Sequence, residues 1–253
     1  MIRGYDLLLV LLGAFLLGSL PAYYFSATEV SGWILGSLLL MAPLAILQWL
    51  RRPAWRSLYP FTVPGGLTWP QLLVFLFSAL LALDLMDFLL TQLMPPSPQL
   101  AANLQELLQF GNPLRGLGVT LTVLLLGPLG EELLFRGVVY HYLRATRGVT
   151  EAVLLSSLLF AFFHPGGYTL QILLFGFLLA LLRWRTASLL PPLLLHLFNN
   201  SWSLLDVNSP GLLPGRGEPL WWLLVVPGTL LFSWLFYRLF VHETPDKSGI
   251  ADA

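Results

Sequence analysis

The sequence of 253 residues contains no cysteine, and only 10% of its residues are charged. The absence of cysteine excludes disulfide bonds, thiol nucleophiles and cysteine-ligated zinc. A soluble globular domain carries roughly a quarter charged residues, so the composition excludes an ordinary soluble enzyme. The formal net charge is +0, which leaves no basic excess for a nucleic-acid partner. Any chemistry must therefore come from Glu, Asp, His, Asn, Ser or Tyr.

Hydrophobic residues make up 57% of the chain and form long runs between Pro, Gly and polar breaks. Each run is close to the ~20 residues that a helix needs to cross a bilayer. This pattern predicts an all-α, polytopic transmembrane helix bundle with about eight spans and a polar catalytic cavity in its core. The expected spans are Leu7–Phe25, Ser31–Leu50, Gln71–Leu93, Gly116–Tyr142, Thr150–Phe163, Tyr168–Leu182, Ser188–Leu205 and Leu220–Phe240.

The basic residues predict how the helices are oriented, because cytoplasmic loops of membrane proteins are enriched in Arg and Lys. With a cytoplasmic N-terminus, only Arg115 and Arg216 fall outside. We therefore expect a multi-pass protein of a bacterial cytoplasmic membrane, with both termini in the cytoplasm and the lipid bilayer as its surroundings. The residues expected inside are Arg3, Arg51, Arg52, Arg56, Arg144, Arg147, Arg183, Arg185, Arg238 and Lys247.

Leucines at helical spacing in Pro98–Asn112 predict an amphipathic helix on the outer interface.

Four parts of the chain are expected to differ in role. The four parts are the N-terminal transmembrane helices and linkers (1–115), the catalytic core (116–205), the last loop and helix (206–241) and a polar, disordered tail (242–253).

The expected spans Thr150–Phe163 and Tyr168–Leu182 are short and meet at His164-Pro165-Gly166-Gly167. Backbone freed by Pro and Gly at membrane depth is tolerated only where protein covers it or a wet cavity solvates it. The break therefore indicates a cavity, which helix lengths suggest opens toward the inner face.

Ionisable residues lie inside the fourth predicted span, where a charge costs roughly 2.5–3.5 kcal/mol on insertion scales. Glu132 and Arg136 are four residues apart and fall within about 40° of each other on a helix, so they can pair. Glu131 points away from Arg136 and remains available as a general base or a metal ligand.

Further polar groups come from other spans: His164 ends the fifth, and His196 and Asn200 share one face of the seventh. Two donors on one face can form an oxyanion hole. Each of these features, taken singly, is equally well explained as a structural contact between helices. This holds for the ion pair, for the histidine beside a Pro-Gly turn and for the asparagine in a span. Their coincidence on three helices favours a hydrolytic site.

Three ordered motifs carry a family resemblance. The chain reads E-E-x-x-x-R, then F-x-x-x-H, then H-x-x-x-N, and it resembles the CAAX protease and bacteriocin-processing family, which includes type II CAAX prenyl endopeptidases and Abi-like proteins. The resemblance covers about Leu125–Leu205. The motif residues are Glu131, Glu132, Arg136, Phe160, His164, His196 and Asn200.

The resemblance implies an intramembrane endopeptidase. Glu131 and His164 would activate a water, and His196 with Asn200 would stabilise the oxyanion. The residues with an orienting or packing role would be Glu132, Arg136 and Phe160.

The sequence leaves open whether the enzyme uses a metal. Two histidines and a carboxylate could hold zinc, and the candidate ligands would be Glu131, Glu132, His164 and His196. A carboxylate that works without metal explains the same residues. The zinc-protease motif H-E-x-x-H is absent from the chain.

Asp84 and Asp87 form a possible secondary polar site on one face of the third span. They support one alternative, a proton- or cation-coupled transporter. A second alternative is a non-catalytic immunity or scaffold protein. For the endopeptidase, the substrate could be a CAAX-type tail, a bacteriocin or peptide leader, or a membrane-protein segment.

Overall fold

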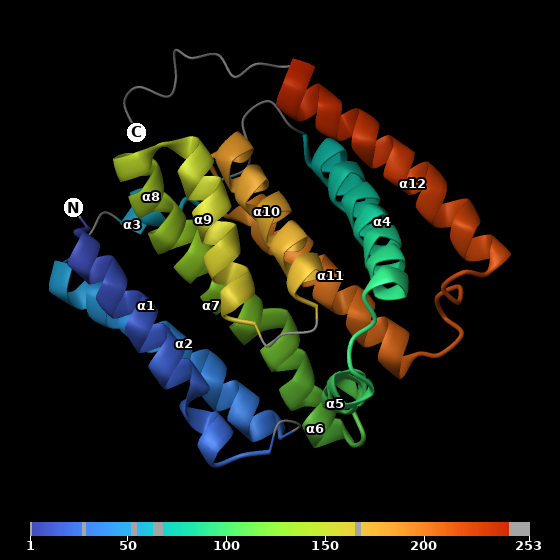
Figure 1. Cartoon of the computed structure of the whole chain (residues 1–253), viewed down its shortest axis with the longest axis horizontal. Helices are drawn as coiled ribbons and strands as arrows, with labels where there is room; N and C mark the ends of the chain where they lie inside the picture. The colour runs from blue at the N-terminus through green and yellow to red at the C-terminus, as the bar shows by residue number, and fades with distance from the viewer. Residues whose placement is uncertain (1, 27–28, 52–54, 63–67, 165–167, 243–253) are drawn as a thin grey trace.

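The computed structural model describes residues 2–26, 29–51, 55–62, 68–164 and 168–242. These residues form helices and no strand. In Figure 1 the long helices run side by side and alternate in direction, with α1 (Gly4–Ser19) and α2 (Val30–Arg51) on the left and α4 (Trp69–Leu93) and α12 (Pro219–Tyr237) on the right.

The remaining elements lie between or beside these two pairs. The turn η1 (Leu20–Tyr23) continues α1, and a π-helical turn, η4 (Arg238–His242), continues α12. Two short helices, α3 (Trp55–Leu58) and α5 (Pro98–Leu108), precede and follow α4. The centre is built from a long composite helix over Pro113–Arg147 and from α9 (Val149–Phe162), α10 (Thr169–Thr186) and α11 (Leu190–Asn208).

Six helices among the described residues are long and apolar enough to cross a membrane. The shorter helix α9 is apolar as well, and α11 completes the set of eight alternating segments. The prediction of an all-α bundle with about eight spans is confirmed, and the protein is a multi-pass membrane protein. The six are Gly4–Tyr23, Val30–Arg51, Trp69–Leu93, Pro113–Arg147, Thr169–Thr186 and Pro219–Val241.

The composite helix is longer than the predicted span Gly116–Tyr142. It begins at Pro113 because the Asn112 side chain accepts a hydrogen bond from the Arg115 N–H at 3.0 Å. It ends at Gly148, whose φ of 97° is open to glycine but strained for other residues. Its segments are α6 (Pro113–Thr120), η2 (Leu121–Leu126), α7 (Gly127–Glu132), η3 (Leu133–Val139) and α8 (Tyr140–Arg147), and η2 and η3 are π-helical.

Polar contacts tie the N-terminal helix pair together. Arg51 at the end of α2 lies 2.8 Å from the buried carboxylate of Asp6 in α1, and its Nη2 donates to the Tyr5 hydroxyl at 2.6 Å. In the middle of the bundle, η3 and α10 supply many of the buried core side chains, including Leu134, Phe135 and Leu179. The most enclosed part of the molecule is therefore the region around the E-E-x-x-x-R motif.

The predicted amphipathic helix over Pro98–Asn112 is present as α5. The break at His164 is also present between α9 and α10, although Pro165, Gly166 and Gly167 lie outside the described residues. The predicted disordered tail, residues 242–253, lies outside them as well, except for the helix-terminal residue 242.

Candidate active site

The side chains of the three sequence motifs meet in the centre of the bundle. Glu131 and Glu132 end α7, while His164 follows the last turn of α9 and His196 lies in the first half of α11. The site therefore depends on the packing of three separate helices.

Two imidazoles approach the same oxygen atom of Glu131. The Oε2 atom lies 3.5 Å from Nε2 of His164 and 3.7 Å from Nε2 of His196. Both separations are at or beyond the limit of a direct hydrogen bond, so a water that contacts these groups lies beside them and not between them. Glu131 Oε2 is enclosed and accepts no hydrogen bond from the described residues.

The second nitrogen of each imidazole is already engaged. Nδ1 of His164 lies 2.7 Å from the carbonyl oxygen of Phe160, so it must carry the proton and donate. Nδ1 of His196 lies 2.9 Å from Oε1 of Glu132 and donates there in the same way. Each histidine is thus oriented with Nε2 toward Glu131.

Glu132 and Arg136 form the ion pair that their spacing predicts. Nη1 of Arg136 donates to Oε1 of Glu132 at 3.1 Å, and both side chains are at most 1% exposed. This is the same oxygen that holds His196, so one carboxylate oxygen serves a guanidinium and an imidazole.

Arg136 is also held by groups that the sequence did not indicate. Its guanidinium carbon lies 4.3 Å from the centre of the Phe160 ring, and its Nη2 donates to the Gly176 carbonyl at 3.0 Å. A Cβ at Gly176 would lie 2.9 Å from the Phe160 ring and 3.4 Å from Nη2 of Arg136. Phe160 therefore packs as predicted and adds a cation–π contact, and glycine at 176 makes room for both.

Asn200 has a contact that the predicted oxyanion hole does not include. Its Nδ2 donates to the carbonyl oxygen of Val123 at 2.8 Å. In the π-helical segment the Gly127 N–H bonds to Thr122 instead of Val123, and Pro128 has no N–H to offer. Asn200 thus satisfies a carbonyl that the helix leaves unpaired, and one amide hydrogen remains for any other acceptor.

The carboxylate and histidine groups were also candidates for a zinc site. No group of three or more His, Asp or Glu side chains in the described ranges is arranged to hold a metal ion. Both Nδ1 atoms are committed to other partners, and one Glu132 oxygen is shared by Arg136 and His196. Each Nε2 remains directed at Glu131, which is also the orientation of a metal-ligating histidine. The mechanism proposed for the site uses protein groups.

The two acids of the third span, Asp84 and Asp87, lie apart from this site and are paired. Arg216 lies 2.7 Å from Oδ1 of Asp84 and 2.8 Å from Oδ2 of Asp87, and the indole N–H of Trp221 donates to Oδ2 of Asp84 at 2.7 Å. Burial acts to lower the pKa of the Arg216 guanidinium, but the charges of Asp84, Asp87 and Asp206 outweigh burial and raise it. Arg216 and Trp221 had no recognisable signal in the sequence.

A pocket of about 360 Å³ borders the motif residues. It contains Asn200 and Phe175, and the Phe175 ring centre lies 5.2 Å from that of His196. Arg216 and the α5 residue Leu104 also line it, which places it toward the end of the bundle with α5 and α6, opposite the end with the N-terminus and α8 (Figure 1). With the predicted orientation this would be the outer end of the bundle.

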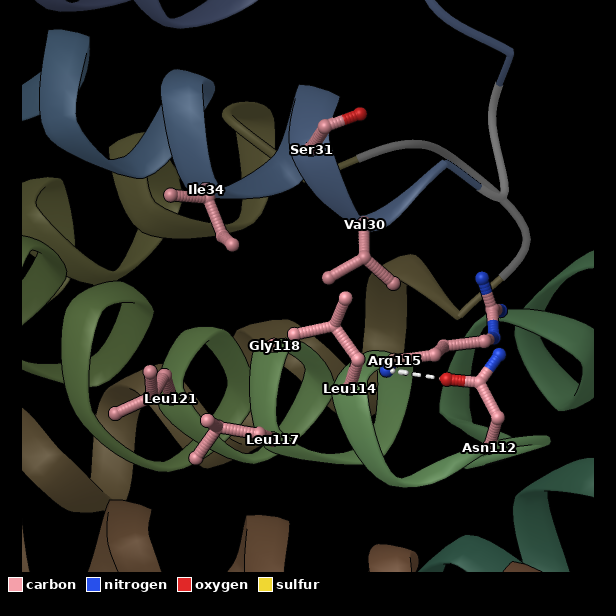
Figure 2. Close-up of a pocket in the computed structure, with 9 residues that line it drawn as sticks. All are labelled: Val30, Ser31, Ile34, Asn112, Leu114, Arg115, Leu117, Gly118 and Leu121. Atoms are coloured by element: carbon pink, nitrogen blue, oxygen red, sulfur yellow. Dashed lines mark hydrogen bonds between the residues drawn. The ribbon is translucent and has the colours of Figure 1, made fainter.

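A second pocket, of about 480 Å³, lies between the start of α2 and α6, where Figure 2 shows Val30, Ile34 and Leu121 around it. Its polar residues are Ser31, Asn112 and Arg115, and it contains no carboxylate or imidazole. This pocket is separate from the motif residues.

Comparison with known proteins gives one match. Residues 113–202 match the family model described as type II CAAX prenyl endopeptidase Rce1-like, and this range includes all three motifs. No curated protein and no solved structure matches the chain. This match, over about a third of the chain, supports the resemblance to the CAAX protease and bacteriocin-processing family that the three motifs indicated.

Proposed function

We propose that the protein is an intramembrane endopeptidase in which Glu131 activates a water for attack on a peptide bond. The observation that carries the proposal is the approach of Nε2 atoms from His164 and His196 to one Glu131 oxygen, at 3.5 and 3.7 Å. A water held beside these three atoms would contact the general base and an imidazole at once. The family match supports a protease.

In the proposed first step, Glu131 takes one proton from this water while the water oxygen forms a bond to the carbonyl carbon of the substrate. His164 orients the water, because its Nδ1–H is used by the Phe160 carbonyl and its Nε2 keeps a lone pair. The second water proton stays on the oxygen that becomes part of the new carboxyl group.

The tetrahedral oxyanion then needs a donor, and His196 supplies one in its protonated form. Glu132 holds Nδ1–H of that imidazolium, and Nε2–H is left to donate to the oxyanion. Asn200 contributes the amide hydrogen that Val123 does not use. Protonated Glu131 finally gives its proton to the amide nitrogen, and the carbon–nitrogen bond breaks to give a carboxyl and an amine product.

The test is cleavage of membrane-tethered reporter peptides by the purified full-length protein in liposomes. The reporters carry a CAAX-type tail, a peptide leader or a membrane-protein segment. Glu131→Gln should lower the cleavage rate by about 10²- to 10⁴-fold, since general-base catalysis contributes this much. The matched control is Glu151→Gln, which changes an exposed glutamate at the start of α9. Unchanged cleavage by Glu131→Gln would contradict the proposal.

A metal chelator separates the two mechanisms that the sequence left open. We expect cleavage to survive a strong zinc chelator, because no group of three or more such donors among the described residues is arranged to hold a metal ion. Cleavage that stops with the chelator and returns with zinc would replace the carboxylate mechanism by a metallopeptidase. A wild-type protein that binds the reporters but cleaves none would favour the scaffold function.

A further inference from the structure

The pocket beside the active site combines an apolar wall with a charged end. Leu80, Leu83 and Ile172 form part of the apolar wall. The charged end is formed by Asp84, Asp87 and Arg216. At its other end the pocket reaches Phe175 and Asn200, which are neighbours of His196. A chain bound in this pocket would therefore lie beside Asn200 and one ring away from His196.

The charged end has an excess of negative charge. Arg216 is already engaged by both Asp84 and Asp87, at 2.7 and 2.8 Å, and the charge of Asp206 acts on it as well. One positive group thus faces three negative ones. The carboxylate of Asp87 is 30% exposed, so it is accessible to a ligand, whereas that of Asp84 is 2% exposed.

A second, independent feature of the same pocket indicates a ligand. Gln171 in the first turn of α10 lines the pocket and is 8% exposed, and its Nε2 has no hydrogen-bond partner among the described residues. A buried amide donor without a partner destabilises the protein, because its hydrogen bond to water is lost and not replaced. A peptide carbonyl in the pocket would satisfy it.

We infer that this pocket binds the substrate segment of the enzyme and selects a peptide with a basic side chain, which pairs with Asp87 while Gln171 donates to the peptide backbone. The apolar wall accommodates the neighbouring side chains of such a segment. The inference rests on the proposed function, because it assigns the pocket to the peptide that Glu131 would cleave. It also predicts that a carboxylate is disfavoured here, since Arg216 is already neutralised.

The test measures binding and cleavage separately. Full-length protein with Glu131→Gln in detergent micelles is titrated with three fluorescent peptides that share one apolar sequence and carry Lys, norleucine or Glu at one central position. We expect the Lys peptide to bind about tenfold more tightly than the norleucine peptide, as for a hydrogen bond to a charged group. The Glu peptide should bind most weakly.

Two substitutions then test which residue causes the preference for the Lys peptide. Asp87→Asn should bring the Lys-to-norleucine ratio close to one, and Gln171→Leu should weaken both peptides by a similar factor and leave the ratio unchanged. The matched control Glu106→Gln removes the same charge from an exposed position on α5 at the same end of the bundle. Thermal unfolding followed by tryptophan fluorescence checks that each variant is folded.

The possible results distinguish failure of the peptide-selectivity inference from failure of the proposed protease function. Equal binding of all three peptides, tightest binding of the Glu peptide, or an unchanged ratio in folded Asp87→Asn would overturn the inference. Cleavage of Lys and norleucine peptides at equal rates by the wild type would also overturn it while leaving the protease intact. Lys-selective binding that depends on Asp87, without cleavage by the wild type, would support the pocket and remove the proposed function.

Discussion

Asn200 on α11 donates a hydrogen bond of 2.8 Å to the carbonyl oxygen of Val123 on the composite helix. The bond links the third sequence motif to the π-helical turn that precedes the first motif. It therefore fixes the relative position of two helices that supply Glu131 and His196.

The first prediction concerns this bond. Asn200→Leu should destabilise the protein by about 1–3 kcal/mol, because it leaves a carbonyl without a donor. Pro128→Ala restores a backbone N–H one π-turn after Val123, so we expect the double variant to recover part of the loss. Thermal unfolding of the four proteins forms a double-mutant cycle. Strictly additive effects would show that Pro128 is not the reason for the unpaired carbonyl.

The second prediction separates the two adjacent glutamates. Glu132→Gln should reduce the free energy of unfolding by about 3–5 kcal/mol, because it leaves the fully buried Arg136 without its counterion. Glu131→Gln should leave stability within about 0.5 kcal/mol, as expected away from strong contacts, since its side chain is 21% exposed. Denaturation of both variants in the same detergent checks this. Similar losses in both would mean that Glu131 also has a structural role.

The third prediction concerns the close packing at Gly176. Gly176→Ala places a Cβ 2.9 Å from the Phe160 ring and 3.4 Å from Arg136, and overpacking of this kind costs about 1–3 kcal/mol. We also expect lower proteolytic activity, because the Phe160 carbonyl orients His164.

The matched control for that substitution is Gly18→Ala. A Cβ at Gly18 would lie no closer than 3.7 Å to its neighbours, which is ordinary contact, so stability and activity should be preserved. Both are measured by unfolding and by reporter cleavage. Equal behaviour of the two variants would show that the space at Gly176 is not required.

The fourth prediction compares two tryptophans at the start of α12. Trp221→Phe removes the donor to Asp84, a buried acceptor, and should cost about 1–3 kcal/mol. Trp222→Phe removes a hydrogen bond to the exposed Gly217 carbonyl and should cost less. Unfolding of the two variants side by side provides the measurement, and an equal or larger loss for Trp222→Phe would refute the importance of the Asp84 contact.

Some of these relationships could be predicted from the sequence and others could not. Spacing within one helix predicted the Glu132–Arg136 pair. Side chains four residues apart lie on the same face of an α-helix, and they lie on nearly the same face of a π-helix. The hydropathy pattern likewise predicted the eight segments. Contacts between distant segments had no such signal: Val123 with Asn200, Arg136 with Gly176, and Arg216 with Asp84 depend on how helices pack.

Oε1 of Glu132 bonds both Arg136 and His196, so the same atom serves the buried ion pair and the candidate site. If the proposed hydrolysis were no longer needed, Glu131 and His164 could be lost at small structural cost. Glu132 would still be needed, since it neutralises a buried cation. The buried pair of Glu132 and Arg136 would then outlast the groups that are proposed to activate water.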